Sequence, residues 1–252
     1  MRIAYTISAY RLFNFIKLGV LQLRRLDPEA PILISDDPGP ESPGIEQFAK
    51  DHGCVYLSAR ERRGHFGGDF QSLVNAVEFA EANGCPVGLK ISQRFVFRKI
   101  EGLDAFRKSF SDGTMMAATP GRPSVTTAHT RDTHGFGAFG TLSDVVAIRV
   151  GGINGEGLLQ LYRARLNREK VPWASFIECL VDELHSNVFP GRTVKLPEWT
   201  NPTEDPIYLR RYQANEKQYR ELAKTHGFDG QFPLHEWAYL ERSGYLCKPI
   251  VI

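Results

Sequence analysis

Apolar residues follow two different spacings along the first hundred positions of the chain. Short runs of consecutive apolar residues, typical of buried strands, alternate with longer segments in which apolar residues recur at helical spacing. The predicted strands span residues 3–8, 31–35, 54–57 and 87–91, and the helices between them span 11–26, 45–52 and 69–82. Strands that alternate with helices build a parallel sheet through right-handed crossovers. We therefore expect an α/β fold, with a mostly parallel sheet flanked by helices.

The second half of the chain has a less regular pattern. It contains two predicted strands, 115–119 and 144–150, and three predicted helices, 157–167, 172–187 and 208–226. The stretch 120–140 is rich in Gly, Thr, His and Pro and reads as a long loop over a site, since loops of that length in compact domains are often functional. With no internal repeat and no linker, we expect residues 1–252 to form a single domain with an irregular C-terminal region.

Composition places the chain among ordinary globular proteins. Apolar residues make up 42% of its 252 residues and charged residues 24%, and a chain of this length can bury a sizeable core. The formal net charge of +2 argues against a nucleic-acid partner. No apolar run approaches ~20 residues, so we expect no transmembrane segment, while peripheral membrane contact stays open. Without a signal peptide or a Cys-x-x-Cys pair, we expect a cytoplasmic protein with reduced thiols.

Polar clusters follow the predicted strands of the first half. They are Ser8–Arg11, Asp36–Asp37, the basic, glycine-rich segment Arg60–Gly68, and Ser92–Arg94. Ligands of open α/β sheets bind beyond the carboxyl ends of the strands. We therefore expect these clusters to converge on one crevice, although loops at strand ends are often polar for solvation alone.

The order of these features resembles the nucleotide-binding half of nucleotide-sugar glycosyltransferases with the GT-A fold, in particular family-2-like members. That family begins its nucleotide pocket where Ser8-Ala9-Tyr10-Arg11 stands, and places acids for the base or ribose where Asp36-Asp37 stands. Its metal-binding Lys-x-Asp-x-Asp resembles Lys90-Ile91-Ser92-Gln93-Arg94, but Ser92 and Arg94 replace both carboxylates. The resemblance implies a nucleotide-binding half at 1–100 and an acceptor or catalytic half with a C-terminal extension at 101–252.

The resemblance also implies the function: transfer from a nucleotide-diphosphate sugar to a glycan or small-molecule acceptor, without the usual metal site. No cofactor beyond the donor is implied, and the need for a divalent metal stays open. Two alternatives remain. One is a sugar-nucleotide mutase or a nucleotidyltransferase on the same fold, and the other is an inactive domain that binds a sugar nucleotide. The histidines show no metal-ligand spacing.

Arginine and lysine can neutralise a diphosphate without a metal, and arginine offers a bidentate fork. The candidate donor-binding residues are Ser8, Tyr10, Arg11, Asp36, Asp37, Arg63, His65, Lys90, Ser92 and Arg94. Some of these residues, and the neighbouring Arg62, have a simpler interpretation: Asp36-Asp37 as a turn, Arg62 and Arg63 as solvated charges, and Lys90 as a strand residue paired to an acid. We also expect Asp69 to cap the helix that follows the glycines.

An inverting transferase needs a general base for the acceptor hydroxyl. On the predicted helix 172–187, Glu178, Asp182 and His185 share the polar face, and Asp182-Glu183 resembles the acidic pair of inverting GT-A enzymes. The candidate catalytic residues are therefore Asp182, Glu183 and Glu178. A solvated helix face is the competing interpretation.

Overall fold

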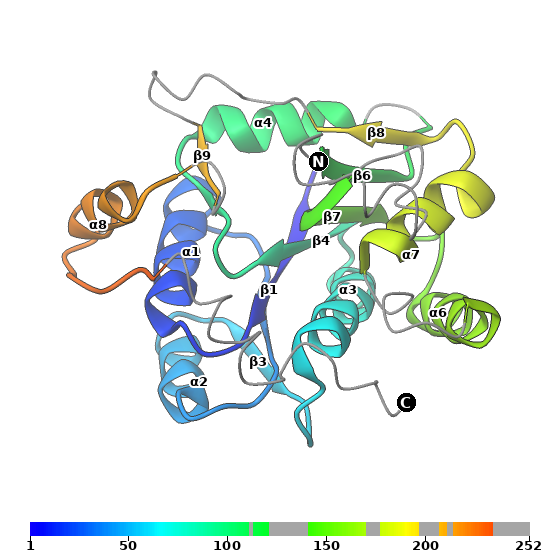
Figure 1. Ribbon diagram of the computed structural model, residues 1–252. Coiled ribbons are helices and arrows are strands. Elements are labelled where there is room, and N and C mark those ends of the chain that lie inside the picture. Colours follow the sequence, from blue (N-terminus) through cyan, green and yellow to red (C-terminus); the bar gives the residue numbers. More distant parts are fainter. Residues whose placement is uncertain (111–112, 121–140, 170–176, 197–206, 211–213, 234–252) are drawn as a thin grey trace.

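The computed structural model describes residues 1–110, 113–120, 141–169, 177–196, 207–210 and 214–233. Its centre is a seven-stranded sheet of order β3-β2-β1-β4-β7-β6-β8 (Figure 1). Four neighbouring strands of this sheet are parallel: β1 Ile3–Ala9, β2 Ile32–Asp36, β3 Val55–Ser58 and β4 Val87–Ser92. The predicted α/β fold with a mostly parallel sheet is confirmed.

The second half of the chain completes the same sheet with a change of direction. Strand β7 (Thr141–Arg149) runs antiparallel to β4, β6 (Met116–Pro120) runs antiparallel to β7, and β8 (Thr193–Lys195) is parallel to β6. A separate two-stranded ribbon pairs β5 (Val96–Phe97) with β9 (Tyr208–Leu209). Strand β7 therefore closes the parallel part of the sheet on the side of β4.

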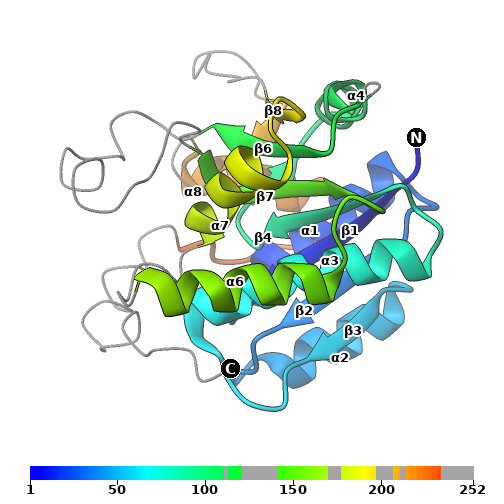
Figure 2. The same cartoon turned by 90° about the vertical axis from the view of Figure 1, so that its right-hand side faces the viewer.

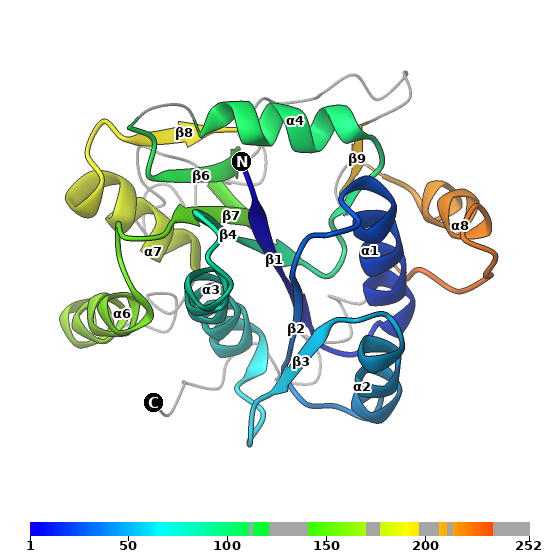
Figure 3. The same cartoon turned by 180° about the vertical axis from the view of Figure 1, so that it is seen from behind.

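Helices cover both faces of the sheet (Figure 3). One face carries α1 (Phe13–Leu26), α2 (Ser42–Asp51) and α4 (Ile100–Ser109), whose apolar residues form one cluster with the odd-numbered residues of β1 and β4. The other face carries α3 (Gly64–Ala82), α6 (Gly155–Glu169) and α7 (Ile177–Glu183), which continues as a π-helical turn, Leu184–Val188. Helix α6 lies beside α3 (Figure 2).

Helix α8 (Glu216–Lys224) packs outside these layers, against α1 and the β5–β9 ribbon. It begins with a capping box in which Asn215 and Gln218 exchange hydrogen bonds. The sequence prediction of one helix over 208–226 is wrong in its first part, because Tyr208–Leu209 forms a strand. The pairing that makes this strand joins residues more than a hundred positions apart, which local periodicity does not report.

The start of α3 also differs from the prediction. The helix begins at Gly64 rather than at Asp69, and Gly67 and Gly68 lie inside it. Gly68 is required by packing: a Cβ atom there would lie 3.0 Å from the Cβ of Asp37. The glycines therefore allow a helix to approach a strand end, where the sequence predicted a glycine-rich loop.

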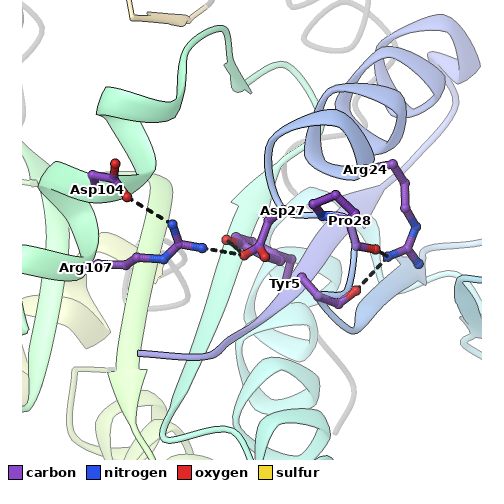
Figure 4. A network of polar contacts seen from close by, with 7 residues as sticks. Tyr5, Arg24, Asp27, Pro28, Asp104 and Arg107 are labelled. Carbon is purple, nitrogen blue, oxygen red and sulfur yellow. Dashed lines mark hydrogen bonds and ion pairs between the residues drawn. The ribbon is translucent and has the colours of Figure 1, made fainter.

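A polar network ties the elements together towards the amino-terminal end of β1 (Figure 4). The buried Tyr5 donates from its hydroxyl to Asp27, at the end of α1, over 2.8 Å. Arg107 of α4 donates to the same Asp27 oxygen at 2.7 Å and to Asp104 at 3.0 Å. Burial, followed by the charge of Asp27, raises the pKa of Tyr5. The network fastens α1 and α4 to the sheet, far along β1 from its carboxyl end.

Candidate functional site

The carboxyl ends of β2, β1 and β4 lie side by side. Ser8 pairs with Ser35 of β2 on one side and with Ser92 of β4 on the other, and Ala9 pairs with Asp36. Adjacent strands are about 4.8 Å apart, so Asp36 and Ser92 are separated by roughly 10 Å across β1. Three of the predicted clusters therefore follow adjacent strands at one edge of the sheet, which we call the C-terminal edge: Ser8–Arg11, Asp36–Asp37 and Ser92–Arg94. The fourth cluster, Arg60–Gly68, contacts the same edge through Arg62 and Arg63.

The two aspartates at the end of β2 serve opposite faces of the sheet. Asp36 is buried and accepts hydrogen bonds on Oδ2 from Ser42 of α2, at 2.5 Å, and from Tyr56 of β3, at 2.6 Å. Burial, followed by the bond to Asp36, raises the pKa of Tyr56 to about 12. The other oxygen, Oδ1, is also buried and accepts no hydrogen bond from the described residues. Oδ2 of Asp36 thus holds α2 and β3 in place, while Oδ1 accepts no hydrogen bond from the described residues.

Asp37 caps the amino-terminal end of α3, although it lies 26 positions before Arg63 in the sequence. Its carboxylate accepts the backbone N–H of Arg63 at 2.6 Å and that of Gly64 at 3.0 Å, and burial raises its pKa. These are donors that the first turn of a helix leaves without a partner in the helix. Asp37, rather than Asp69, therefore occupies the helix N-terminus that an anion would otherwise use.

A tyrosine framed by arginines follows β1. The Tyr10 ring has the guanidinium of Arg62 at 4.2 Å and that of Arg11 at 5.3 Å from its centroid. The backbone N–H of Tyr10 donates to the Gln93 side chain at 3.0 Å, which links the end of β1 to that of β4. Burial lowers the pKa of Arg62, and the positive charge of Arg11 adds to this. The charges of Tyr10 and Asp37 act in the opposite direction but do not outweigh burial, so the pKa is lowered overall.

The backbone is unusual at this point. Arg11 and Leu12 have φ values of 50° and 52°, in the left-handed region that non-glycine side chains rarely adopt. Such residues cost of order 1–3 kcal/mol each and cluster at functional sites. The Arg11 Nε atom is buried and makes no hydrogen bond within the described part of the chain. This short turn carries Arg11 beside the Tyr10 ring, which Arg62 contacts from the segment before α3.

Lys90 lies on β4, two residues before Ser92, and its side chain is buried between the sheet and α3. It is fully buried and forms an ion pair with Asp69 at 2.6 Å. Close by, Ser35 accepts hydrogen bonds from Ser72 at 3.1 Å and Asn75 at 2.9 Å. This arrangement matches the simpler interpretation of Lys90 as a strand residue paired to an acid, and it explains why Asp69 is not a helix cap.

The triplet Ser92-Gln93-Arg94 forms the turn after β4, closed by a hydrogen bond from the Phe95 N–H to the Ser92 carbonyl at 2.9 Å. Asp144 follows in register beside it, since its neighbour Val145 on β7 pairs with Ile91. Arg210, only 2% exposed, donates from Nε to Asp144 at 2.8 Å. No local sequence pattern indicates this pair, because Arg210 follows β9, whose place is set by its pairing with the distant β5.

The predicted catalytic acids lie on α7, which packs on β7 and α3. Glu183 pairs with Arg165 at 3.2 Å and Arg168 at 2.8 Å, and accepts from Asn187. Burial alone would raise its pKa, but the hydrogen bonds from Arg168 and Asn187 and the two arginine charges outweigh burial, and the net shift is downward. Glu178 and Asp182 are half-buried. Glu183 therefore joins α7 to α6 through Arg165 and Arg168.

Two predicted features of the site, the His65 side chain and the loop 121–140, lie outside the described residues. His65 belongs to the first turn of α3, but its side chain is outside the described set, as is the whole loop 121–140. Within the described ranges, no three His, Cys, Asp or Glu side chains are grouped so that they could hold a metal ion. No helix among the described residues is long and apolar enough to cross a membrane.

Comparison with known proteins identifies the fold. No protein-family model matches the sequence, and no curated protein does. Among solved structures, the chain resembles the galactosyltransferase LgtC in complex with donor and acceptor sugar analogues, with a TM-score of 0.57 and 10% identity over 95% of this chain and 99% of that one. It also resembles a glycosyltransferase that acts in glycosylation of the major capsid of PBCV-1, with a TM-score of 0.53 and 11% identity over 89% and 100%.

A third similar structure is a cytidylyltransferase from Leptospira borgpetersenii, with a TM-score of 0.51 and 10% identity over 100% of this chain and 99% of that one. Structural similarity at 10–11% sequence identity identifies the fold alone. The sequence-based assignment of the fold is therefore confirmed, and this chain has the GT-A fold found in nucleotide-sugar glycosyltransferases.

Proposed function

We propose that the chain is a glycosyltransferase-like enzyme that binds a nucleotide-diphosphate sugar at the C-terminal edge of the sheet. The observation that carries the proposal is the set of cations gathered at this edge: Arg11 and Arg62 around Tyr10, and Arg94 in the turn after β4. The edge is the ligand-binding position of open α/β sheets. A cytoplasmic location remains a prediction.

The proposed chemistry needs charge compensation at the diphosphate. The bond between the anomeric carbon and the diphosphate oxygen breaks, the leaving nucleoside diphosphate keeps the electron pair, and the acceptor oxygen forms the new bond. A carboxylate takes the acceptor proton. Guanidinium groups make strong, bidentate hydrogen bonds to phosphate and carry the charge that a metal would otherwise supply.

The residues of the proposed site are assigned to separate roles. Arg11, Arg62, Arg63 and Arg94 are proposed for the diphosphate, Asp36 Oδ1 and Tyr10 for the nucleoside, and Ser8 and Ser92 for hydroxyl contacts. Lys90 is proposed to support the site from below through Asp69. As general base, Asp182, Glu178 and Glu183 of α7 are the proposed residues, and Glu183 is paired with two arginines.

Calorimetry with nucleosides and nucleoside diphosphates tests the proposal. We expect a nucleoside diphosphate to bind more tightly than its nucleoside, in EDTA as well as in manganese, and the matching sugar nucleotide to be consumed in the presence of an acceptor. If none of the UDP, GDP, CDP, ADP and dTDP series bound, the proposal would be wrong. Binding that appeared only with manganese would retain the nucleotide site but reject its arginine-based charge compensation.

A nucleotidyltransferase is the second candidate, favoured by the similarity to a cytidylyltransferase over the full chain. That reaction joins a nucleoside triphosphate to a sugar phosphate and releases pyrophosphate. Pyrophosphate release from a triphosphate and a sugar phosphate would establish it, while transfer from a sugar nucleotide would exclude it as the main activity. Binding without either turnover would indicate a binding domain.

A further inference from the structure

The triplet Ser92-Gln93-Arg94 is held by a part of the chain that lies 125 positions further along. Tyr219 of α8 donates from its hydroxyl to the backbone oxygen of Arg94 at 2.6 Å. Its side chain is fully buried, and its ring meets Phe15 edge to face with 4.9 Å between centroids. The Arg94 guanidinium lies 5.9 Å from the same Phe15 ring. Tyr219 therefore fixes both the backbone of Arg94 and the ring beside its side chain.

The downstream end of the same turn is fixed by β9. Strand β5 begins two residues after Arg94, and its Val96 and Phe97 pair with Leu209 and Tyr208. Phe95, between the triplet and β5, stacks on the Tyr208 ring with 4.8 Å between centroids. The triplet is thus a short turn anchored by β4 on one side and by the β9 ribbon on the other.

A third contact joins the same segment to the neighbouring strand. Arg210 follows β9 directly and is buried against Asp144 of β7. A buried charge is costly unless it is paired in good geometry, so this contact constrains where the segment can sit. Three independent contacts, from Tyr208, Arg210 and Tyr219, therefore converge on the ends of β4 and β7.

We propose that the β9–α8 segment, residues 207–210 and 214–233, is the positioning element of the donor site, with Tyr219 the positioning residue for Arg94. This inference rests on the proposed function, in which Arg94 binds the diphosphate. Holding the Arg94 backbone in place presents the guanidinium to the phosphates before binding, and such preorganisation lowers the entropic cost of association. Tyr219 itself does not touch the ligand.

The variant Tyr219→Phe tests this inference because it removes the hydroxyl and keeps the ring. We expect affinity for the nucleoside diphosphate to fall roughly three- to tenfold, as for one lost hydrogen bond, with affinity for the free nucleoside unchanged. Tyr5→Phe is the matched control: it removes a similar buried hydrogen bond, to Asp27, at a distance from the edge (Figure 4). It should lower the melting temperature without changing either affinity.

A double variant of Tyr219→Phe with Arg94→Ala separates the positioning role of Tyr219 from the ligand-binding role of Arg94. If Tyr219 acts through Arg94, Tyr219→Phe should have no further effect on diphosphate affinity in the Arg94→Ala background. Equal losses for nucleoside and diphosphate, additive losses in the double variant, or no loss at all would each overturn the positioning role while leaving Arg94 as a ligand. An Arg94→Ala variant with wild-type diphosphate affinity would instead reject the assumption about Arg94 itself.

Discussion

At the residue scale, the side chains of Ser92 and Arg94 determine which ion the turn after β4 can accept. A hard divalent cation prefers anionic oxygen ligands, which a hydroxyl and a guanidinium do not supply. A guanidinium does supply the charge and hydrogen bonds that suit a phosphate. A carboxylate in register with this turn, Asp144, is paired with Arg210. The local chemistry therefore favours an anion at this turn.

Arg94→Ala should weaken binding of a nucleoside diphosphate about tenfold to hundredfold and leave nucleoside binding nearly unchanged. A guanidinium–phosphate contact contributes roughly 1.5–3 kcal/mol. Arg94→Lys should recover only part of the loss, because the ammonium keeps the charge and loses the fork. Calorimetry on both variants measures this. An equal loss for nucleoside and diphosphate would mean that Arg94 has a structural role only.

Gly68→Ala should destabilise the fold by about 1–3 kcal/mol, the usual cost of overpacking. The new Cβ would meet Asp37 Cβ at 3.0 Å and Cγ at 3.2 Å, which moves the carboxylate that caps α3. Gly19→Ala is the control on another helix, where the new Cβ meets only Ile7 at an ordinary 3.6 Å. There we expect a gain of roughly 0.5–1 kcal/mol. Chemical denaturation compares the two; equal effects would contradict the packing argument.

At the element scale, the strands of the first half and the helices between them could be predicted because each is a local periodic pattern. The structure departs from the prediction where a contact with a residue distant in the sequence determines the local backbone conformation. Asp37 moves the start of α3 to Gly64, and β5 turns Tyr208–Leu209 into a strand. The four polar clusters were visible for the same local reason. Arg210 and Tyr219 were not, since only tertiary contacts bring them to the edge.

Glu183 joins two helices, and its charge should make their contact sensitive to acid. Its pKa is lowered in the folded state, so the stabilisation it provides is present above about pH 4.5, the usual glutamate value, and is lost as pH falls through the lower folded value. Glu183→Gln should cost roughly 1–3 kcal/mol at neutral pH, because it leaves the buried Arg165 without its counter-charge.

The measurement for this prediction is unfolding of both proteins between pH 7 and pH 3. The difference between wild type and Glu183→Gln should shrink as the pH drops below the usual glutamate value. Lys50→Gln is a useful control, because its partner Glu46 lies on an exposed helix face and such pairs contribute little. A difference that stayed constant down to pH 3 would show that Glu183 does not stabilise the fold through its charge.

At the scale of the whole molecule, the three largest apolar clusters of the described residues attach different parts of the fold. Two of them fasten helices to the faces of the main sheet, and the third attaches α8 to α1 and to the β5–β9 ribbon. The polar residues of the C-terminal edge lie where these parts meet. The proposed donor site therefore depends on the attachment of α8 as well as on the sheet, which connects molecular stability to ligand affinity.

The attachment of α8 should weaken in mild acid. His226, just after α8, contacts Gln22 of α1 at 2.6 Å, and Gln22 donates its amide hydrogens to the carbonyls of Phe97 and Arg98. The Gln22 oxygen is thus the acceptor and His226 Nε2 the donor. Burial, followed by the charge of Arg25, lowers the pKa of His226. The folded state consequently resists the proton that the unfolded state takes up below about pH 6.5.

Stability should therefore fall as pH drops from 6.5 towards the lower folded pKa of His226, and hydrogen exchange should report the loss first in the amides of α8. His226→Gln keeps a donor for Gln22 but cannot titrate, so it should reduce the change in α8 protection between pH 7 and pH 5.5. Protection of β1 and β4, in the centre of the sheet, serves as the internal reference. If α8 in the variant lost protection with pH as steeply as in the wild type, another group would control the attachment. If the prediction holds and the β9–α8 segment positions Arg94, affinity for the nucleoside diphosphate should fall over the same pH interval in the wild type and less in the variant.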